Sequence, residues 1–343
     1  MITFPVKSLQ GKICLSPFVM IEVTLDGKVR MCGCHGWQPT TVGNLLESSL
    51  ETILSSLSAQ KIRQSIIDGT YEYCNEKLCG VIINGALNTV DTLPPNVKAL
   101  LTNATQFEMP HHISVQGDKT CNLSCPSCRT TVIKSDPAQK QQQELVGRAI
   151  AKNIFCQPSD KKIVLEVSGT GELFASDMLL SLVNSVDRSQ FPNVKLHIHT
   201  NGLLSQIRWH KIVNVESAID KITVSVDAAN ADTYTKIRRG GQWSDLLAAM
   251  NFLKIKKQQL NFALHSRMIV QQGNWQEMAQ FYNLSKSHSV DIVEYSRITN
   301  WGTWAPWDFL HHDVMNPMHT EYVDANQLLT QIKQLPNTWF VGL

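Results

Sequence analysis

From about residue 112 to residue 300, short strand-like runs alternate with helical patterns, and this alternation constrains the fold more than any other feature. The strand-like runs are 113–116, 163–168, 194–199, 222–227, 262–270 and 292–296. Helical patterns lie between them, at 138–153, 177–187, 204–216, 230–237 with 244–257, and 274–287. Such alternation predicts parallel strands joined by crossover helices. Six units are too few for an eight-fold barrel, so we predict an α/β fold that forms a partial, open (β/α)6 barrel.

The helix starts carry polar residues of the kind that cap helices. Ser176 and Asn230 precede helical runs and are predicted N-caps. Asn274, followed three residues later by Glu277, has the pattern of a capping box.

One alternating face of the predicted strands is polar, whereas the other carries mainly Val, Ile and Leu. The polar positions are Ser114, Gln116, Glu166, Ser168, His197, His199, Thr223, Ser225, Asp227, His265 and Arg267. Polar groups that were dry and unpaired would cost several kcal/mol. We therefore expect this face to surround a cavity for a polar cofactor and substrate. A one-residue error in strand phase would reverse the assignment of that strand.

Three of the nine cysteines, Cys121, Cys125 and Cys128, share one short loop directly after the first of these strands. Three thiolates so placed can hold three irons of a four-iron, four-sulfur cube and leave the fourth iron open. A zinc site normally has four N or S ligands, and a ferredoxin-type run supplies a fourth Cys per cluster. Neither fourth ligand is present locally, because Arg129, Thr130 and Thr131 follow.

The Cys-x3-Cys-x2-Cys spacing resembles that of the radical S-adenosylmethionine (radical SAM) superfamily, and further matching motifs follow in order. They are Ser168-Gly-Thr-Gly-Glu172, Thr200-Asn201-Gly202 and Ser225-Val-Asp227 with the Arg-containing stretch after it. The chain departs from the family pattern at Leu173, where Pro is usual, and at Ser127, where an aromatic residue often lies against adenine.

The resemblance implies a set of cofactor-binding residues. The glycine-rich motif would hold the methionine amino group of SAM, and Ser225 would bind its carboxylate or ribose. Arg238 or Arg267 would pair with the SAM carboxylate, or each forms a structural ion pair instead. The full implied set is Gly169, Gly171, Glu172, Thr200, Asn201, Ser225, Asp227, Arg238 and Arg267.

A second group of cysteines lies in the first 80 residues and resembles a shortened SPASM segment, the auxiliary-cluster region of some radical SAM proteins. Its pattern is a first Cys, an Asp-Gly hairpin, a second Cys, a Gly-Asn turn, a helix and a closing Cys pair. In relatives this segment usually follows the core, whereas here it precedes it. Cys14, Cys32, Cys74 and Cys79 would bind an auxiliary [4Fe–4S] cluster, with Cys34 as spare or replacement for Cys32. A structural zinc site is the rival interpretation.

The resemblance implies reductive cleavage of SAM and removal of a hydrogen atom from a substrate. Glu166, His199 and Glu294 are candidate acid–base residues, with structural roles as the alternative for each. Oxidative modification of a peptide is the first expected activity, and dehydrogenation or rearrangement of a sugar or other small molecule is the alternative. A non-catalytic iron–sulfur or zinc scaffold is the second alternative. An external one-electron reductant, such as flavodoxin or ferredoxin, is an expected partner.

Composition narrows the remaining classes. The formal net charge of the 343 residues is +2 and no basic block occurs, which argues against a nucleic-acid surface. No apolar run is long enough for a membrane span, and the start of the chain has no secretory signal. Two groups of cysteines suit metal binding in a reducing cytoplasm. We predict an auxiliary-cluster domain with linker at 1–105, the linker covering 85–110, a core at 106–300 and an extension at 301–343.

Overall fold

The computed structural model describes residues 9–34, 36–83, 85–102, 109–167 and 170–343. Ten strands form one sheet in the order β12-β11-β10-β9-β8-β7-β6-β2-β3-β4. They are β2 (Met20–Thr24), β3 (Lys28–Arg30), β4 (Gly43–Asn44), β6 (His112–Gln116), β7 (Ile163–Val167), β8 (Val194–Thr200), β9 (Ile219–Ser225), β10 (Ala263–Val270), β11 (Ile292–Arg297) and β12 (Thr338–Val341). A small second sheet pairs β1 (Lys12–Ile13) with β5 (Asn88–Thr89).

The sheet is mostly parallel and open. Within this sheet the pairs from β2 through β6 to β12 are parallel, whereas β3 pairs antiparallel with both β2 and β4. All six predicted strands are present, and the α/β fold class is confirmed. The sheet extends beyond the prediction on both sides, through β2 from the Cys-rich region and β12 from the C-terminal region. The predicted boundaries after residues 105 and 300 therefore cut across one continuous sheet.

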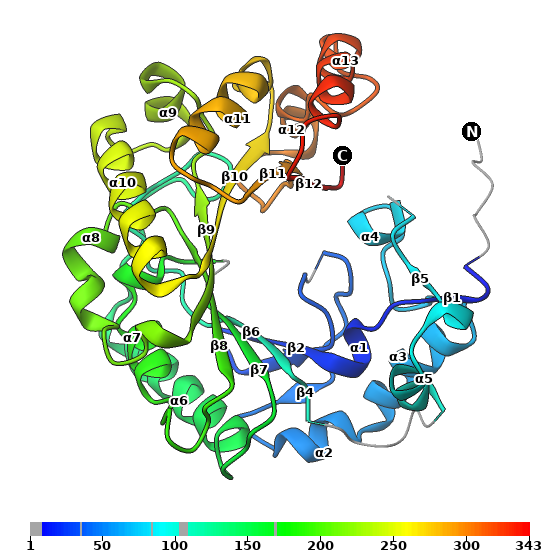
Figure 1. Cartoon of the computed structure of the whole chain (residues 1–343). Helices are drawn as coiled ribbons and strands as arrows, with labels where there is room; N and C mark the ends of the chain where they lie inside the picture. The colour runs from blue at the N-terminus through cyan, green and yellow to red at the C-terminus, as the bar shows by residue number, and fades with distance from the viewer. Residues whose placement is uncertain (1–8, 35, 84, 103–108, 168–169) are drawn as a thin grey trace.

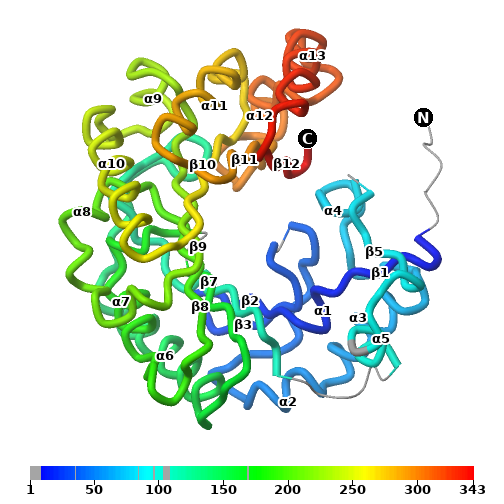
Figure 2. Tube along the Cα trace, viewed as in Figure 1, coloured from blue at the N-terminus to red at the C-terminus, as the bar shows by residue number. Residues whose placement is uncertain are grey.

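Helices surround the strands as an outer layer (Figure 1, Figure 2). Over the core they are α6 (Pro137–Ile154), α7 (Asp177–Asn184), α8 (Ser205–Arg208), α9 (Ala231–Ile237), α10 (Trp243–Leu260) and α11 (Met278–Ser287). The N-terminal region has α1 (Ser16–Val19), α2 (Leu50–Leu54), α3 (Leu57–Ile67), α4 (Gly80–Ile83) and α5 (Pro95–Leu101), and the C-terminal region has α12 (Pro306–His312) and α13 (Tyr322–Ile332).

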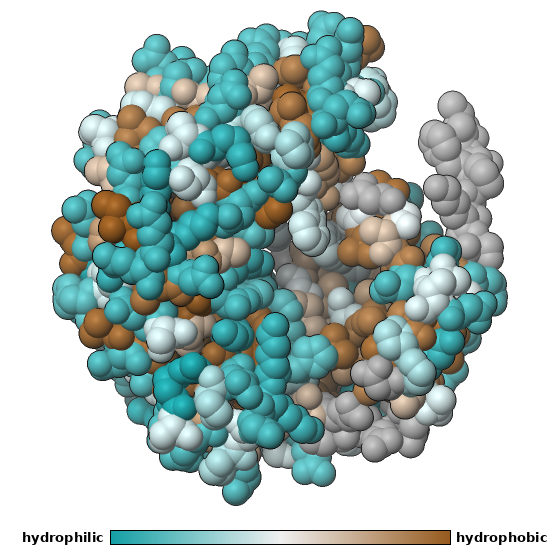
Figure 3. All heavy atoms as spheres, viewed as in Figure 1, coloured by the Kyte–Doolittle hydropathy of each residue, from teal (hydrophilic) through white to brown (hydrophobic). Residues whose placement is uncertain are grey.

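The apolar face of the strands packs under this helical layer, as the alternation predicts. Ile163, Leu165 and Val167 of β7 and Leu196 and Ile198 of β8 are all buried in the main core. The polar positions of the same strands are only partly buried. Figure 3 shows the molecule hollowed between the α/β body and the N-terminal region. The described residues include no helix long and apolar enough to cross a membrane.

Two predicted helix caps are confirmed. The side chain of Ser176 accepts the N–H of Leu179, and that of Asn230 accepts the N–H of Thr233. The predicted capping box at Asn274 is wrong, because its amide donates to the carbonyls of Asp227 and Ile269 and its oxygen accepts the N–H of Gln271. The side chain of Asn274 therefore forms tertiary hydrogen bonds and does not cap the helix as the local pattern predicts.

Two further expectations differ from the structure. The stretch 204–216 is not one helix but the short α8 followed by 3-10 turns, consistent with the run of β-branched residues at 212, 213 and 215. The stretch 85–110, predicted as a linker, contains β5 and α5. Strand β5 pairs with β1, and residues 103–108 lie outside the described residues.

Candidate metal centre and cofactor site

The carboxyl ends of four neighbouring strands carry the predicted site. The Cys loop follows β6, the segment with Gly171 and Glu172 follows β7, Thr200 ends β8, and Asp227 follows β9. In parallel α/β sheets, ligands bind at this edge. The amide of Asn201, just after β8, lies 3.8 Å from Cys121 Sγ and 2.9 Å from the side-chain oxygen of Asn122. The fold therefore brings sequence-distant motifs into contact with the Cys loop.

Backbone hydrogen bonds give the Cys loop a defined shape. The N–H groups of Cys128 and Arg129 both donate to the carbonyl of Cys125, each at 2.9 Å. The N–H of Cys121 donates to Ile133, and that of Ser124 donates to the carbonyl of Arg239. The loop is thus a tight turn closed at both ends, which suits three sulfurs held around one group.

Each of the three sulfurs accepts a hydrogen bond. The N–H of Leu123 lies 3.4 Å from Cys121 Sγ, a guanidinium nitrogen of Arg129 3.3 Å from Cys128 Sγ, and one of Arg238 3.7 Å from Cys125 Sγ. Such donors stabilise thiolates and are the contacts that tune iron–sulfur clusters. The donor set therefore fits a cluster on this loop.

Burial and nearby charges act in opposite directions on the ionisable groups of the loop. Burial alone would lower the pKa of Arg129, but the adjacent Cys128, Cys121 and Cys125 raise it. Burial raises the pKa of Cys121, the Glu172 carboxylate adds to this, and Arg129 opposes it. Among the described residues, no three His, Cys, Asp or Glu side chains gather tightly enough to hold a single metal ion.

Glu172 is buried, and the chain itself surrounds its carboxylate. One oxygen accepts the hydroxyl of Thr200 at 2.6 Å and the N–H of Phe174, while the other accepts the N–H of Asn201 at 2.7 Å. A Cβ at Gly171 would lie 2.4 Å from the carbonyl oxygen of Asp118, so only Gly fits beside the start of the Cys loop. In this structure Gly171 and Glu172 pack against the backbone at the start of the Cys loop, and the N–H of Glu172 donates to the carbonyl of Thr120. Ser168 and Gly169 of the same motif lie outside the described residues.

Asp227 and Arg238 form a buried pair beside the loop. Their side chains meet at 2.8 Å. Asp227 has a left-handed backbone (φ 62) and accepts the N–H of Ile269 at 2.7 Å. Arg267, the other candidate for the SAM carboxylate, pairs instead with Glu294 at 2.7 Å. Ser225 lies in register with Arg267 at the end of β9.

The candidate acid–base residues lie on the polar strand face and are paired. Glu166 lies between His112 at 2.7 Å and His199 at 3.0 Å. Glu294 lies between His265 at 2.8 Å and Arg267. Burial alone would raise the pKa of Glu294, but hydrogen bonding from His265 and the charge of Arg267 lower it to about 2. At neutral pH Glu294 is thus an ionised partner of Arg267.

The N-terminal cysteines also come together. Burial raises the pKa of Cys32, and nearby Cys14, Cys79 and Cys34 raise it further. Burial, with Cys14 and Cys79 nearby, raises the pKa of Cys74 to about 12. Cys34 lies near both Glu22 and Cys79. Cys14 and Cys79 thus lie near both Cys32 and Cys74, and Cys34 lies near Cys32 and Cys79.

Several site residues were missed from the sequence. Asp118 is buried and accepts from the N–H of Thr120 at 2.8 Å and the amide of Gln143 at 2.8 Å, which anchors the loop to α6. The Asp-x-Thr spacing of an Asx-turn was the available signal. Glu22 of β2 is buried and accepts from Arg30 and from Gln116 of β6. No local signal predicts that contact, because it joins strands far apart in the chain.

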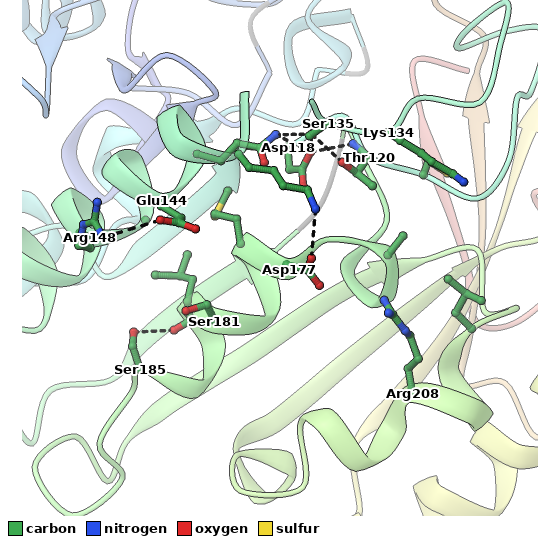
Figure 4. Close-up of a pocket in the computed structure, with 18 of the residues that line it drawn as sticks. Asp118, Thr120, Lys134, Ser135, Glu144, Arg148, Asp177, Ser181, Ser185 and Arg208 are labelled. Atoms are coloured by element: carbon green, nitrogen blue, oxygen red, sulfur yellow. Dashed lines mark hydrogen bonds and ion pairs between the residues drawn. The ribbon is translucent and has the colours of Figure 1, made fainter. Parts of the chain in front are cut away.

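A cavity of about 910 Å³ opens behind the Cys loop, between α6 and α7. Asp118 and Thr120 reach it from the loop side (Figure 4). Cys121 also lines the cavity. At its rim Lys140 faces Asp177 and Arg148 faces Glu144, with separations of 3.8 and 3.9 Å. The loop is therefore approached from the helical side as well as from the strand side.

Comparison with known proteins identifies the N-terminal region. Residues 14–80 match the SPASM family, an iron–sulfur cluster-binding domain. The match begins at Cys14 and ends one residue after Cys79. This region is therefore similar to a SPASM iron–sulfur domain. The loop with Cys121, Cys125 and Cys128 lies outside that match, at the carboxyl ends of the strands.

Two curated relatives are distant and only partly covered. The ribosomal protein uS12 methylthiotransferase RimO of Hydrogenobaculum sp. is 22% identical over 72% of this chain and 62% of its own length. The GTP 3',8-cyclase of Limosilactobacillus fermentum is 26% identical over 57% of each chain. Among solved structures, Streptococcus suis SuiB bound to S-adenosylmethionine aligns with 96% of this chain and 72% of its own chain, at 11% identity and a TM-score of 0.44.

Proposed function

We propose that this protein is a radical SAM enzyme that reductively cleaves S-adenosylmethionine and oxidatively modifies a peptide. The observation that carries the proposal is the Cys loop itself, which has three thiols, each with a hydrogen-bond donor, at the carboxyl edge of a parallel sheet. Three thiol ligands leave one iron of a four-iron cube free for a small molecule. A purely structural site has no need of that vacancy.

Cys121, Cys125 and Cys128 would hold the [4Fe–4S] cluster, and the strand ends around them would bind SAM. When bound, the cluster would supply one electron to the sulfonium of SAM. SAM would in turn supply the 5′-deoxyadenosyl radical that removes a hydrogen atom from the substrate. Arg129 and Arg238 would each donate a hydrogen bond to one of the ligand sulfurs. Glu172 orients Thr200 and Asn201 at the end of β8, and Asn201 in turn contacts Cys121.

Binding of SAM would use the positions that the family resemblance indicates. Gly171, Thr200, Asn201 and Ser225 line the strand ends, and Ser225 remains the proposed ligand of the carboxylate or ribose. Glu172 would bind the ammonium of SAM through its remaining acceptor site, beside the three hydrogen bonds that it already accepts within the chain. Arg267, bound to Glu294, would reach the SAM carboxylate only by leaving that pair.

The polar strand face would contact the substrate. Glu166 with His199, and Glu294 with His265, are ionised carboxylate–imidazole pairs that could receive a proton when a substrate radical is oxidised. Cys14, Cys32, Cys74 and Cys79 would hold an auxiliary cluster, which would supply an acceptor for the electron left on the oxidised substrate and so favours net oxidation. A flavodoxin or ferredoxin would supply the first electron, in the cytoplasm. A sugar or other small molecule is the alternative substrate.

The decisive experiment is anaerobic incubation of reconstituted protein with SAM and dithionite. Formation of 5′-deoxyadenosine, with iron and sulfide near two clusters per chain, is the expected result. Zinc in place of iron and sulfide, with no 5′-deoxyadenosine, would refute the enzyme and leave a scaffold. Deuterium transfer from labelled candidate peptides or sugars into 5′-deoxyadenosine then separates the two substrate classes.

A further inference from the structure

Arg238 makes an unusual pair of contacts for a cation beside a cofactor pocket. Its side chain is 12% exposed. One terminal nitrogen pairs with Asp227 at 2.8 Å, and the other points to Cys125 Sγ at 3.7 Å. Its buried Nε has no partner among the described residues. Both terminal nitrogens are thus engaged by the protein, one by an anion and one by a predicted cluster ligand.

The partner of Arg238 is held in place from two other elements. Asp227 accepts the N–H of Ile269 in β10 at 2.7 Å, and Asn274 donates to the Asp227 carbonyl at 2.8 Å. These bonds stabilise the left-handed backbone of Asp227, which is uncommon for a residue other than glycine. The guanidinium is therefore fixed relative to the sulfur, and a fixed charge has a defined electrostatic effect.

We propose that Arg238, held by Asp227, tunes the reduction potential of the cluster on the Cys121, Cys125 and Cys128 loop through its contact with Cys125 Sγ. This inference rests on the proposed function. A cation that donates to a ligand sulfur stabilises the more negatively charged, reduced cluster and so raises its potential. Asp227 offsets part of that charge. Arg238 is then a positioning residue that acts through Cys125, and its effect is present before SAM binds.

Two substitutions have opposite expected effects. Arg238→Gln removes the cation and is expected to lower the midpoint potential of the cluster. Asp227→Asn keeps a side chain of the same shape but removes the offsetting anion, and is expected to raise it. Arg239→Gln is the matched control, because Arg239 is exposed and contacts Ser124 Oγ and two loop carbonyls but no sulfur. Its expected shift is clearly smaller than that of Arg238→Gln.

The measurement is an anaerobic redox titration of each reconstituted variant, followed by electron paramagnetic resonance without SAM. A variant with Cys121, Cys125 and Cys128 all replaced by Ala gives the auxiliary signal for subtraction. Opposite shifts support the inference. If Arg238 serves only the SAM carboxylate, its loss will weaken SAM binding but leave the potential without SAM unchanged, which overturns the inference.

The remaining outcomes are equally decisive. Shifts of the same sign in both variants, or an equal shift in Arg239→Gln, would show a general disturbance of the loop and overturn the inference. If Arg238→Gln does not retain its cluster, the potentials of Asp227→Asn and Arg238→Lys test the inference. The midpoint potential of Arg238→Lys is expected to stay closer to that of the wild type. A wild-type protein whose spectrum shows no cluster that responds to SAM would instead refute the proposed function itself.

Discussion

The two cysteine groups of this protein differ in what surrounds their sulfurs. In the loop at 121–128, cationic side chains contact two of the three thiols. In the N-terminal group, the charges that act on Cys32 and Cys74 come from other thiols and from Glu76, and burial raises the pKa of both. The difference between the two groups therefore lies in the cations that donate to the loop sulfurs, while burial raises the pKa of Cys121 as it does those of Cys32 and Cys74.

The two cysteine groups also rest on hydrophobic cores of different size. The Cys loop rests on the main core, which includes Val115, Val167 and Leu173. The N-terminal cysteines Cys14 and Cys74 pack on a separate small cluster formed by Ile13, Ile66, Tyr71, Leu87 and Leu93. A core of that size provides little stability. The comparison teaches that metal at the N-terminal site would stabilise the fold, while metal at the loop would mainly supply chemistry.

The largest effect is expected from the loop. Cys125→Ala should abolish formation of 5′-deoxyadenosine and reduce iron by about one cluster, because it removes a ligand and the acceptor of Arg238. Product analysis and iron and sulfide assays measure both. Cys156→Ala is the control, since this exposed thiol belongs to neither group. Full cleavage by the Cys125→Ala variant would contradict the assignment of the loop.

Removal of metal should separate the two regions. Anaerobic chelation is expected to increase hydrogen exchange around α3 and β5, which pack near the small cluster, well before it affects β7 or β8. Hydrogen-exchange mass spectrometry of holo and metal-free protein measures this. Equal protection of the N-terminal region in both forms would show that metal is not needed for its stability.

Cys79→Ala sharpens the comparison by acting on the N-terminal site alone. It should reduce iron by about one cluster and spare some cleavage of SAM uncoupled from substrate oxidation, because the loop retains its ligands. Cys34→Ala is the matched variant and should retain more iron, since Cys34 is the spare thiol of the predicted ligand set. Greater iron loss in Cys34→Ala than in Cys32→Ala would show that Cys34 is the cluster ligand and Cys32 the spare thiol.

The smallest effect is expected behind the loop. Glu172→Gln replaces a buried acceptor with a side chain whose amide hydrogens face either Thr200 or the N–H of Asn201. The free energy of unfolding should fall by about 1–3 kcal/mol. Anaerobic denaturant titration measures it, with the exposed Glu144→Gln as control. An unchanged stability would show that Glu172 is not a structural support and favour its role as the ammonium ligand.

The sequence by itself determined the strand–helix order, the apolar face and the composition of both cysteine groups, because these depend on local periodicity and spacing. Helix caps were predictable at Ser176 and Asn230, where only neighbouring backbone groups compete for the side chain. The prediction failed at Asn274, because the distant carbonyl of Asp227 binds its side chain.

Only the tertiary structure decided which charged groups meet. Arg238 reaches Cys125 across 113 positions, and Gln116 reaches Glu22 across 94. Such contacts depend on strand register and on how loops pack at the sheet edge, which no local pattern specifies. The same packing makes β2 and β12 parts of one sheet with the core.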